Sequence, residues 1–588
     1  MSRGAASRRT RALLAGGLLA FAAAVPARAQ TPLGTPAGFE MTRSVQQSLK
    51  RLQELWMQWL GAALQDNPAR ESETLRSMQA TARQLGFQRL PDLALGASAR
   101  ALQSAAEGDF TRARRALDAA EVLDPGRPRI AFEAATVARR QGSGLRAAGA
   151  AGRGFVRLLA GHRYRAPVSA RIQLWMLLVL LTAAALFVAV EALTKGSAAY
   201  GDLHRWLAAR MSEGAAHALA LALLLGPAAL PGGPVWLVLI WSVVLWGYGS
   251  RAERVALGLV WLVLGLAPVG AAAIEERLAL AQSPPMRALD EFEAGELTGS
   301  LFTDLQVLRG ALPDDPAVTE LIADVHRTLG QWDIARSLYR QVLAQEGDVA
   351  AALLNLGADS FRKGDFAAAN AYFQRATGAG PYAAAAWYNL SQSYSETYQF
   401  EDSRQSLARA RELDGERVDG WMQTPNPERV LTFNGGLSRR HEIAERLHAA
   451  WTSSGDESAA APGPWLRRQA PIAATLAALA ALMLHLARRG YGYSDPAQWL
   501  PGRSNRIARW VRALVPALGQ AETGEGLAAA ANLLLLAALA TLPTLAWLGG
   551  DFSDAAPLRA ATATLAAAGG LLYLGLRVRS ELGAPVRT

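Results

Sequence analysis

Residues 316–417 repeat one pattern three times at a period of 34 residues, which constrains the fold more than any other feature of this 588-residue chain. The three blocks begin PAVTELIADV, AAALLNLGAD and AAAWYNLSQS. Small residues recur where two helices would have to cross, first at Ala323, Gly357 and Ser391 and then at Ala335, Ala369 and Ser403. A period of this length predicts a stack of helical hairpins, and therefore an all-α fold.

The larger residues of the blocks fit the same hairpins. Apolar side chains recur beside the small ones, at Ile322, Leu356, Leu390, Tyr339, Phe373 and Leu407. Gly330 and Gly364 fall between the two helices of a block, where a tight turn favours glycine. Pro381 stands where the second helix of the middle block should end.

This pattern resembles the tetratricopeptide repeat family. The middle block matches the family's positions at Gly357, Gly364, Phe366, Ala369, Phe373, Ala376 and Pro381. The outer blocks depart from them: His326 stands where the family prefers an aromatic, and in the third block Tyr398 replaces the turn glycine and Ser403 the small apolar residue. Ser360 is a similar departure in the middle block. The resemblance covers about a fifth of the chain and implies binding of protein partners.

The resemblance also implies a binding site, because the first helices of this family line a concave groove. By the family's spacing, the groove positions are Glu320, Asp324, Arg327, Leu354, Phe361, Arg362, Tyr388, Gln392 and Glu396. We expect Phe361 and Tyr388 to form an exposed aromatic pair, the composition of an anchor pocket for a peptide or a helix. The alternative is that both rings pack against neighbouring hairpins.

Composition indicates that part of the chain lies in lipid, because 51% of the residues are hydrophobic and only 19% are charged. Many of the arginines behind the net charge of +10 flank apolar segments, which favours membrane orientation over nucleic-acid binding. The apolar stretches predict about seven transmembrane helices, at residues 173–193, 214–230, 234–249, 255–273, 471–487, 527–548 and 560–576.

The N-terminus is typical of a secretory signal. Four arginines precede a short apolar run, and small residues around Arg28 offer a cleavage site before Gln30. The absence of cysteine excludes disulfides and thiol catalysis. Arginine-rich segments then alternate with arginine-free turns along the chain, which predicts a multi-pass protein of a bacterial inner membrane with both repeat regions in the periplasm.

A second repeat-like module is predicted ahead of the first span. The run Glu107-Gly108-Asp109-Phe110 and the small residues after it reproduce the second half of one repeat. The predicted domains are a signal peptide (1–29), a periplasmic helical region (30–170), four transmembrane helices (173–273), a periplasmic tetratricopeptide domain (286–451, with repeats 316–349, 350–383 and 384–417), a linker (452–470), three transmembrane helices with a basic cytoplasmic loop (471–576) and a cytoplasmic tail (577–588).

Chemical motifs are scarce. His441, Glu445 and His448 share one helix face, but the neighbouring arginines disfavour a cation, so a solvated face is the better interpretation. We expect no catalytic residue, no metal, no cofactor, no nucleic acid and no small-molecule substrate.

The sequence therefore predicts a membrane-anchored scaffold or adaptor that is not an enzyme. It would bind proteins or peptides through the groove, be held by the lipid bilayer, and serve in assembly or organisation of a cell-envelope complex. One alternative is an accessory or core subunit of a transporter or channel. Another is an enzyme of envelope polymers, which the short, bare outer loops disfavour.

Overall fold

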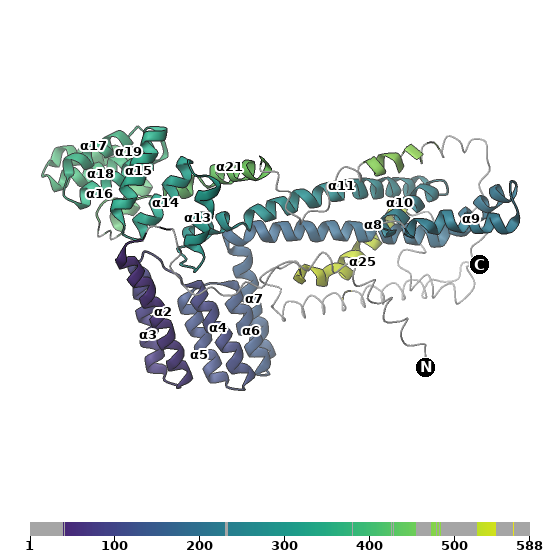
Figure 1. The fold of residues 1–588 in the computed structure, drawn as a ribbon, viewed down its shortest axis with the longest axis horizontal. Helices are drawn as coiled ribbons and strands as arrows, with labels where there is room; N and C mark the ends of the chain where they lie inside the picture. The colour runs from purple at the N-terminus through teal and green to yellow at the C-terminus, as the bar shows by residue number, and fades with distance from the viewer. Residues whose placement is uncertain are drawn as a thin grey trace. The chain divides into compact units, whose positions relative to one another are not determined.

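The computed structural model describes residues 39, 41–229, 233–378, 380–424, 426, 428–453, 472–477, 479–480, 483, 526–547 and 569. Within these residues the chain is all-helical, and the pairing of Arg89 with Glu296 is an isolated bridge rather than a strand. The chain divides into two compact units (Figure 1). We call them the repeat unit, which comprises the described residues up to Arg157 and those from Leu280 to Ser453, and the apolar unit, which comprises the remainder.

The repeat unit is a series of antiparallel helical hairpins. Its N-terminal half pairs α2 (Arg43–Leu64) with α3 (Pro68–Gln84) and α4 (Pro91–Ala106) with α5 (Phe110–Leu123), and continues with α6 (Pro128–Arg140), which packs against α4 and α5, and α7 (Gly144–Ala160). Its C-terminal half pairs α12 (Pro284–Glu293) with α13 (Leu301–Ala311), α14 (Pro316–Thr328) with α15 (Trp332–Glu346), α16 (Ala350–Arg362) with α17 (Phe366–Ala376), and α18 (Ala383–Glu396) with α19 (Phe400–Gln423), followed by α20 (Gly435–Ser438) and α21 (Arg440–Ser453).

The predicted hairpin of each block is present, and its small residues have the expected role. A Cβ atom on Gly357 would lie 2.6 Å from Cδ1 of Phe373 and closer still to its Cε1, so α16 and α17 approach each other more closely than any residue with a Cβ atom allows. Ala323, Ala335 and Ala369 are fully buried. Close crossing of the two helices therefore explains why small residues recur at these positions.

The turns between paired helices use one backbone conformation. Gly330 and Gly364 have φ values of 73° and 79°. Tyr398 occupies the same place in the third block with a φ of 59°, although a left-handed conformation is unfavourable for a residue with a Cβ atom. The hairpin geometry thus dictates the conformation at residue 398 even where the sequence lacks the glycine.

The two halves of the repeat unit share one hydrophobic core, although the sequence predicts two separate domains at 30–170 and 286–451. Buried residues of α2 to α6 pack in the same cluster as those of α12 to α14 and Ile443 of α21. Main-chain hydrogen bonds join the halves, since Gln88 N donates to Gly295 O at 2.9 Å and Leu297 N to Arg89 O at 2.9 Å. The N-terminal hairpins therefore belong to the same folded body as the 34-residue repeats.

The apolar unit contains α8 (His162–Ala208), α9 (Glu213–Leu225), the short η1 (Gly226–Ala229), α10 (Gly233–Trp246), α11 (Arg251–Ala281) and α25 (Gly526–Trp547). Two stretches are long and apolar enough to cross a membrane, Val168–Ala208 within α8 and Arg251–Ala281. Shorter apolar helices cover Glu213–Ala229, Val235–Trp246 and Asn532–Leu542. Trp175 of α8 donates a hydrogen bond to the Thr541 carbonyl at 3.1 Å, which fixes α25 against α8.

The prediction of about seven spans is therefore confirmed only in part. The described residues contain two candidate spans and shorter apolar helices. The predicted spans at 173–193 and 255–273 fall within α8 and α11, and the one at 527–548 coincides with α25 apart from its last residue. The predicted signal peptide, the span at 560–576 except residue 569, most of the span at 471–487, the basic loop before α25 and the C-terminal tail lie outside the described residues.

Candidate peptide-binding site

A segment of the chain itself, extended at residues 431–434, lies across the first helices of the three repeats. We call residues 428–436 the strap, and the side of α14, α16 and α18 that it contacts the first-helix face. Asn389 of α18 and Asn355 of α16 each bind one strap residue twice. Asn389 accepts from Leu431 N at 2.7 Å and donates to Leu431 O at 2.8 Å, and Asn355 accepts from Phe433 N at 3.0 Å and donates to Phe433 O at 2.8 Å.

These four hydrogen bonds involve only main-chain atoms of the strap. A side-chain amide carries both a donor and an acceptor, so it can pair with the N–H and C=O of one extended residue as a neighbouring strand would. The two asparagines stand 34 residues apart, at the same position of successive repeats. The hydrogen bonds at these two positions therefore recognise the backbone of an extended residue, whatever its side chain.

The far end of the strap binds charged residues of α14. Asp324 accepts a hydrogen bond from Gly436 N at 2.9 Å, and its other oxygen accepts one from the Tyr339 hydroxyl at 2.7 Å. Arg327 donates to the Thr432 hydroxyl at 3.0 Å and to the Asn434 side chain at 2.5 Å. The strap thus crosses α18, α16 and α14 in that order.

Two glycines allow the strap to touch α14. A Cβ atom added to Gly436 would lie 2.6 Å from Leu321 Cβ and closer still to the α14 backbone, and one added to Gly435 would lie 2.6 Å from Ala351 Cβ. Neither glycine has a positive φ, so the requirement is for space and not for conformation. No larger residue fits at Gly436 without moving a helix backbone.

Apolar side chains of the strap complete the hydrophobic core of the middle repeats. Val430 is 3% exposed and clusters with Leu354, Ala358 and Phe373, while Leu431 and Phe433 pack against the same cluster. The Phe433 ring meets Tyr382 edge-on with 5.1 Å between ring centroids. The strap therefore combines main-chain recognition with alternate apolar anchors.

Two carboxyl groups beneath the strap are held largely without solvent. Burial, aided by the nearby Asp324 and opposed by Arg439 at 3.6 Å, raises the pKa of Glu320 to about 8. Burial likewise raises the pKa of Asp324 to about 7, against the lowering effect of Arg327. Both carboxyl groups are fully buried. The strap end therefore lies over acids that titrate close to neutral pH.

Helix α21 fixes the chain after the strap. Ile443 and Leu447 are fully buried, and Arg446 forms an ion pair with Asp315 at 2.5 Å. Arg439 contacts Glu346 at 2.7 Å. In the same helix, His441 lies 3.1 Å from Glu445 with both side chains largely exposed, which is the solvated face that the sequence predicts.

Seven of the nine predicted groove residues divide into three groups. Asp324, Arg327 and Glu396 contact the strap, the last through an ion pair with Arg429, and Glu320 lies directly beneath Gly435. Leu354 is buried in the core of the middle repeats. Gln392 hydrogen-bonds its neighbour Ser391, and Arg362 pairs with Asp359 and stacks over the Trp332 ring at 4.9 Å, so neither side chain reaches the strap through a hydrogen bond.

The prediction of an exposed aromatic pair was wrong. Tyr388 is 6% exposed and packs against Trp421 of α19, with 5.5 Å between ring centroids. Phe361 is half-buried and meets Phe366 edge-on at 5.3 Å. Each ring packs within its own hairpin, Phe361 against the start of α17 and Tyr388 against α19.

Asn355 and Asn389 make the most regular contacts with the strap, and neither is among the nine residues predicted from the sequence. A signal was present, since an identical amide recurs in the same place within the apolar runs LLNLG and WYNLS. A polar side chain fully buried in an otherwise apolar helix must find a partner. Both asparagines are fully buried, and the strap backbone is that partner.

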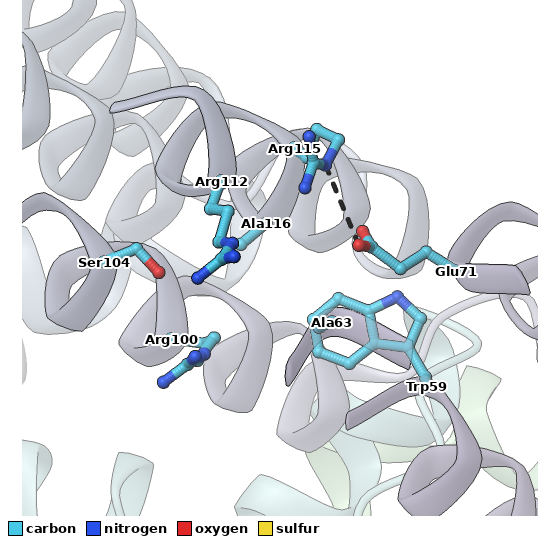
Figure 2. Close-up of a pocket in the computed structure, with 8 residues that line it drawn as sticks. All are labelled: Trp59, Ala63, Glu71, Arg100, Ser104, Arg112, Arg115 and Ala116. Carbon is cyan, nitrogen blue, oxygen red and sulfur yellow. Dashed lines mark ion pairs between the residues drawn. The ribbon is translucent and has the colours of Figure 1, made fainter. Parts of the chain in front are cut away.

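A small polar cavity in the N-terminal half is a weaker candidate. Figure 2 shows it between Trp59, Ser104 and the pair Glu71 and Arg115, whose charged atoms lie 3.7 Å apart. It encloses about 10 Å³, the room of one water molecule. A cavity of this size excludes any larger ligand.

The apolar unit holds a buried charge cluster. Lys195 of α8 lies 2.6 Å from Glu191 of the same helix and 2.5 Å from Glu253 of α11. All three side chains are less than a tenth exposed. The carboxylate of Glu191, near the end of the span predicted at 173–193, therefore turns inward to the lysine.

No model of a known protein family matches the sequence, and no curated protein matches it.

Proposed function

We propose that this protein is a membrane-anchored tetratricopeptide scaffold or adaptor that binds extended segments of protein partners across its first-helix face. One observation carries the proposal: Asn355 and Asn389 each pair twice with a main-chain residue at repeat spacing. A face that recognises backbone can accept an extended segment of another protein by the same contacts. Such a site suits partner binding, not catalysis.

The apolar helices supply the anchor in this proposal. The two candidate spans and the segregation of arginines to alternate loops support a multi-pass protein of a bacterial inner membrane. The repeat unit then faces the periplasm, where its partners would be components of an envelope complex during assembly or organisation. The partners are proteins or peptides, and the lipid bilayer is the second contact surface.

Partner capture by the full-length protein tests the proposal. The double variant Asn355→Ala with Asn389→Ala removes all four main-chain hydrogen bonds, so we expect it to capture cross-linked partners at least tenfold less well than the native chain. Asn370→Ala is the matched control, because Asn370 lies on α17 and not on the first-helix face. An unchanged set of partners in the double variant would rule out this face as the docking site.

A transporter or channel subunit is the second candidate, and the cluster of Glu191, Lys195 and Glu253 favours it. Ionisable groups inside a membrane protein often mark an ion or proton path. We expect Glu253→Gln to change proton or cation flux through reconstituted protein only if this candidate is right. Equal flux in empty vesicles and in vesicles with the native protein would eliminate it.

A further inference from the structure

We infer that the strap is a built-in competitor for the partner site, and that a partner segment binds the first-helix face only by displacing it. This inference rests on the proposed function, because it assumes that the face binds partner segments. The strap fills the site in the free protein through Asn355, Asn389 and Asp324. A partner that uses the same main-chain contacts cannot bind while the strap holds them.

The contacts of the strap suit an exchangeable ligand. Its hydrogen bonds to the two asparagines use backbone atoms that every extended peptide possesses. The ion pair of Arg429 with Glu396, near its N-terminal end, is mostly solvent-exposed on the arginine side, and exposed pairs contribute little. Release can therefore begin at Arg429 without uncovering a buried charge.

The strap contacts also indicate which sequence features a partner segment needs. Leu431 and Phe433 lie two residues apart, as alternate residues of an extended chain do, and both pack against the same cluster. Gly435 and Gly436 follow, where a Cβ atom would collide with α14 or α16. The partner of the inferred exchange is therefore a segment with two apolar residues at alternate positions of an extended chain. One further residue follows, and then a pair of glycines.

The covalent tether gives the strap its advantage. A ligand joined to its site by a short connection acts at an effective concentration of about millimolar. A partner segment with the same intrinsic affinity binds with a lower apparent affinity, because only a small fraction of the molecules has an open strap. The strap therefore closes the site to weak ligands, and opening it should strengthen partner binding without any new contact.

The strap also connects two parts of the repeat unit, since it lies between α19 and α21. Its C-terminal end continues into α20, which begins at Gly435, and α21 is held by Ile443 and Leu447. Displacement would free the chain from Arg429 to Gly436, including the first residues of α20, while α21 keeps its own anchors. The site can thus exchange its occupant without unfolding the hairpins.

Peptide binding to the full-length protein in detergent or nanodiscs tests the inference. The probe is a fluorescent peptide of residues 428–436, ERVLTFNGG. Gly436→Val should expel the native strap by collision with the α14 backbone while leaving the first-helix face intact. We expect this variant to bind the probe more than tenfold more tightly than the native protein does. Gly420→Val is the control, because a Cβ atom at Gly420 meets open space.

Two further arms identify the binding site and its requirement for glycine. Adding Asn355→Ala and Asn389→Ala to the Gly436→Val variant should abolish the gain in affinity. A probe with alanine at both glycine positions should bind neither protein. Equal probe affinity in the native protein and the Gly436→Val variant would overturn the inference, provided that hydrogen exchange still finds the α16 amides protected.

Hydrogen exchange on the native chain tests the same inference without a strap variant. We expect excess unlabelled probe to accelerate exchange at the amides of Leu431 and Phe433, because the probe takes their places on the two asparagines. Unchanged protection at saturating probe would mean that the strap is a permanent part of the fold. If the double asparagine variant still loses its partners in that case, partners dock on the strap-covered face by other contacts, so partner binding at this face stands and only the displacement fails.

Discussion

At the residue scale, two asparagines explain more of the site than the nine residues expected from family spacing. Family spacing placed Asp324 and Arg327 on the right face, and both contact the strap. Family spacing could not show which residues of that face make the main contacts, because those contacts depend on the segment bound there. Asn355 and Asn389 stand out only once the strap backbone beside them is known.

The buried acid beneath the strap predicts a pH dependence of stability. The folded-state pKa of Glu320 is raised from 4.5 to about 8, so the folded protein holds a proton that the unfolded chain releases above pH 4.5. The stabilisation is complete below the unfolded pKa and is lost as the pH rises through the folded pKa. We expect the repeat unit to become less stable between about pH 5 and pH 8, as measured by hydrogen exchange.

Glu320→Gln provides the comparison for that measurement. A glutamine keeps the shape of the protonated acid and cannot ionise, so the loss of stability toward pH 8 should become smaller. A variant whose stability falls with pH as steeply as that of the native protein would mean that Glu320 is ionised in the folded state. Asp324 would still contribute, because its pKa is also raised, to about 7.

A second prediction at this scale concerns the backbone of Tyr398. Its left-handed backbone costs about 1 kcal/mol in a residue with a Cβ atom. Tyr398→Gly removes that cost, and the ring it deletes is 80% exposed, so little packing is lost. We expect slower hydrogen exchange in α18 and α19. Faster exchange would show that the contact of the ring with Phe400 outweighs the backbone cost.

At the scale of elements, periodicity predicted the hairpins well and the strap not at all. The 34-residue period places α14 to α18 in their blocks because each helix must bury one face every repeat. The strap has no period, and its apolar residues at alternate positions are too few to distinguish it from a loop. Its position is decided by tertiary partners on three different helices.

The crossing of α16 and α17 supplies the test of the repeat alignment. Ala369 is fully buried, so Ala369→Arg would place an unpaired charge inside the middle hairpin and cost several kcal/mol. We expect α16 to α19 to lose protection from protease and hydrogen exchange. Ala367→Arg is the control, because Ala367 is exposed on the same helix. Equal protection in both variants would contradict the alignment.

At the scale of the whole molecule, the sequence predicted an all-α chain with a repeat part and an apolar part, and the structure confirms that much. It did not predict that the N-terminal hairpins share a core with the repeats. That core is built from Leu289, Leu305 and Leu321 on one side and Leu52 and Trp59 on the other. Contacts between residues so far apart in sequence produce no periodic pattern in the sequence. A fragment that begins at Asp290 would therefore expose the shared core.

Membrane orientation is the prediction that belongs to this scale. Because arginines segregate to alternate loops, a reporter active only in the periplasm should be active when fused near Gly378 and inactive near Gly502. The reverse pattern would place the repeat unit in the cytoplasm. The proposed function would then need partners in that compartment.

The central claim is that partners bind across the first-helix face, and photo-cross-linking in living cells tests it most directly. A photoreactive residue at Gln392 lies on α18 beside Asn389, and one at Gln374 lies on the exposed side of α17. The account predicts covalent adducts with partner proteins from position 392, lost with Asn355→Ala and Asn389→Ala, and none from position 374. Adducts from position 374 alone, or adducts from position 392 that survive the loss of both asparagines, would contradict it.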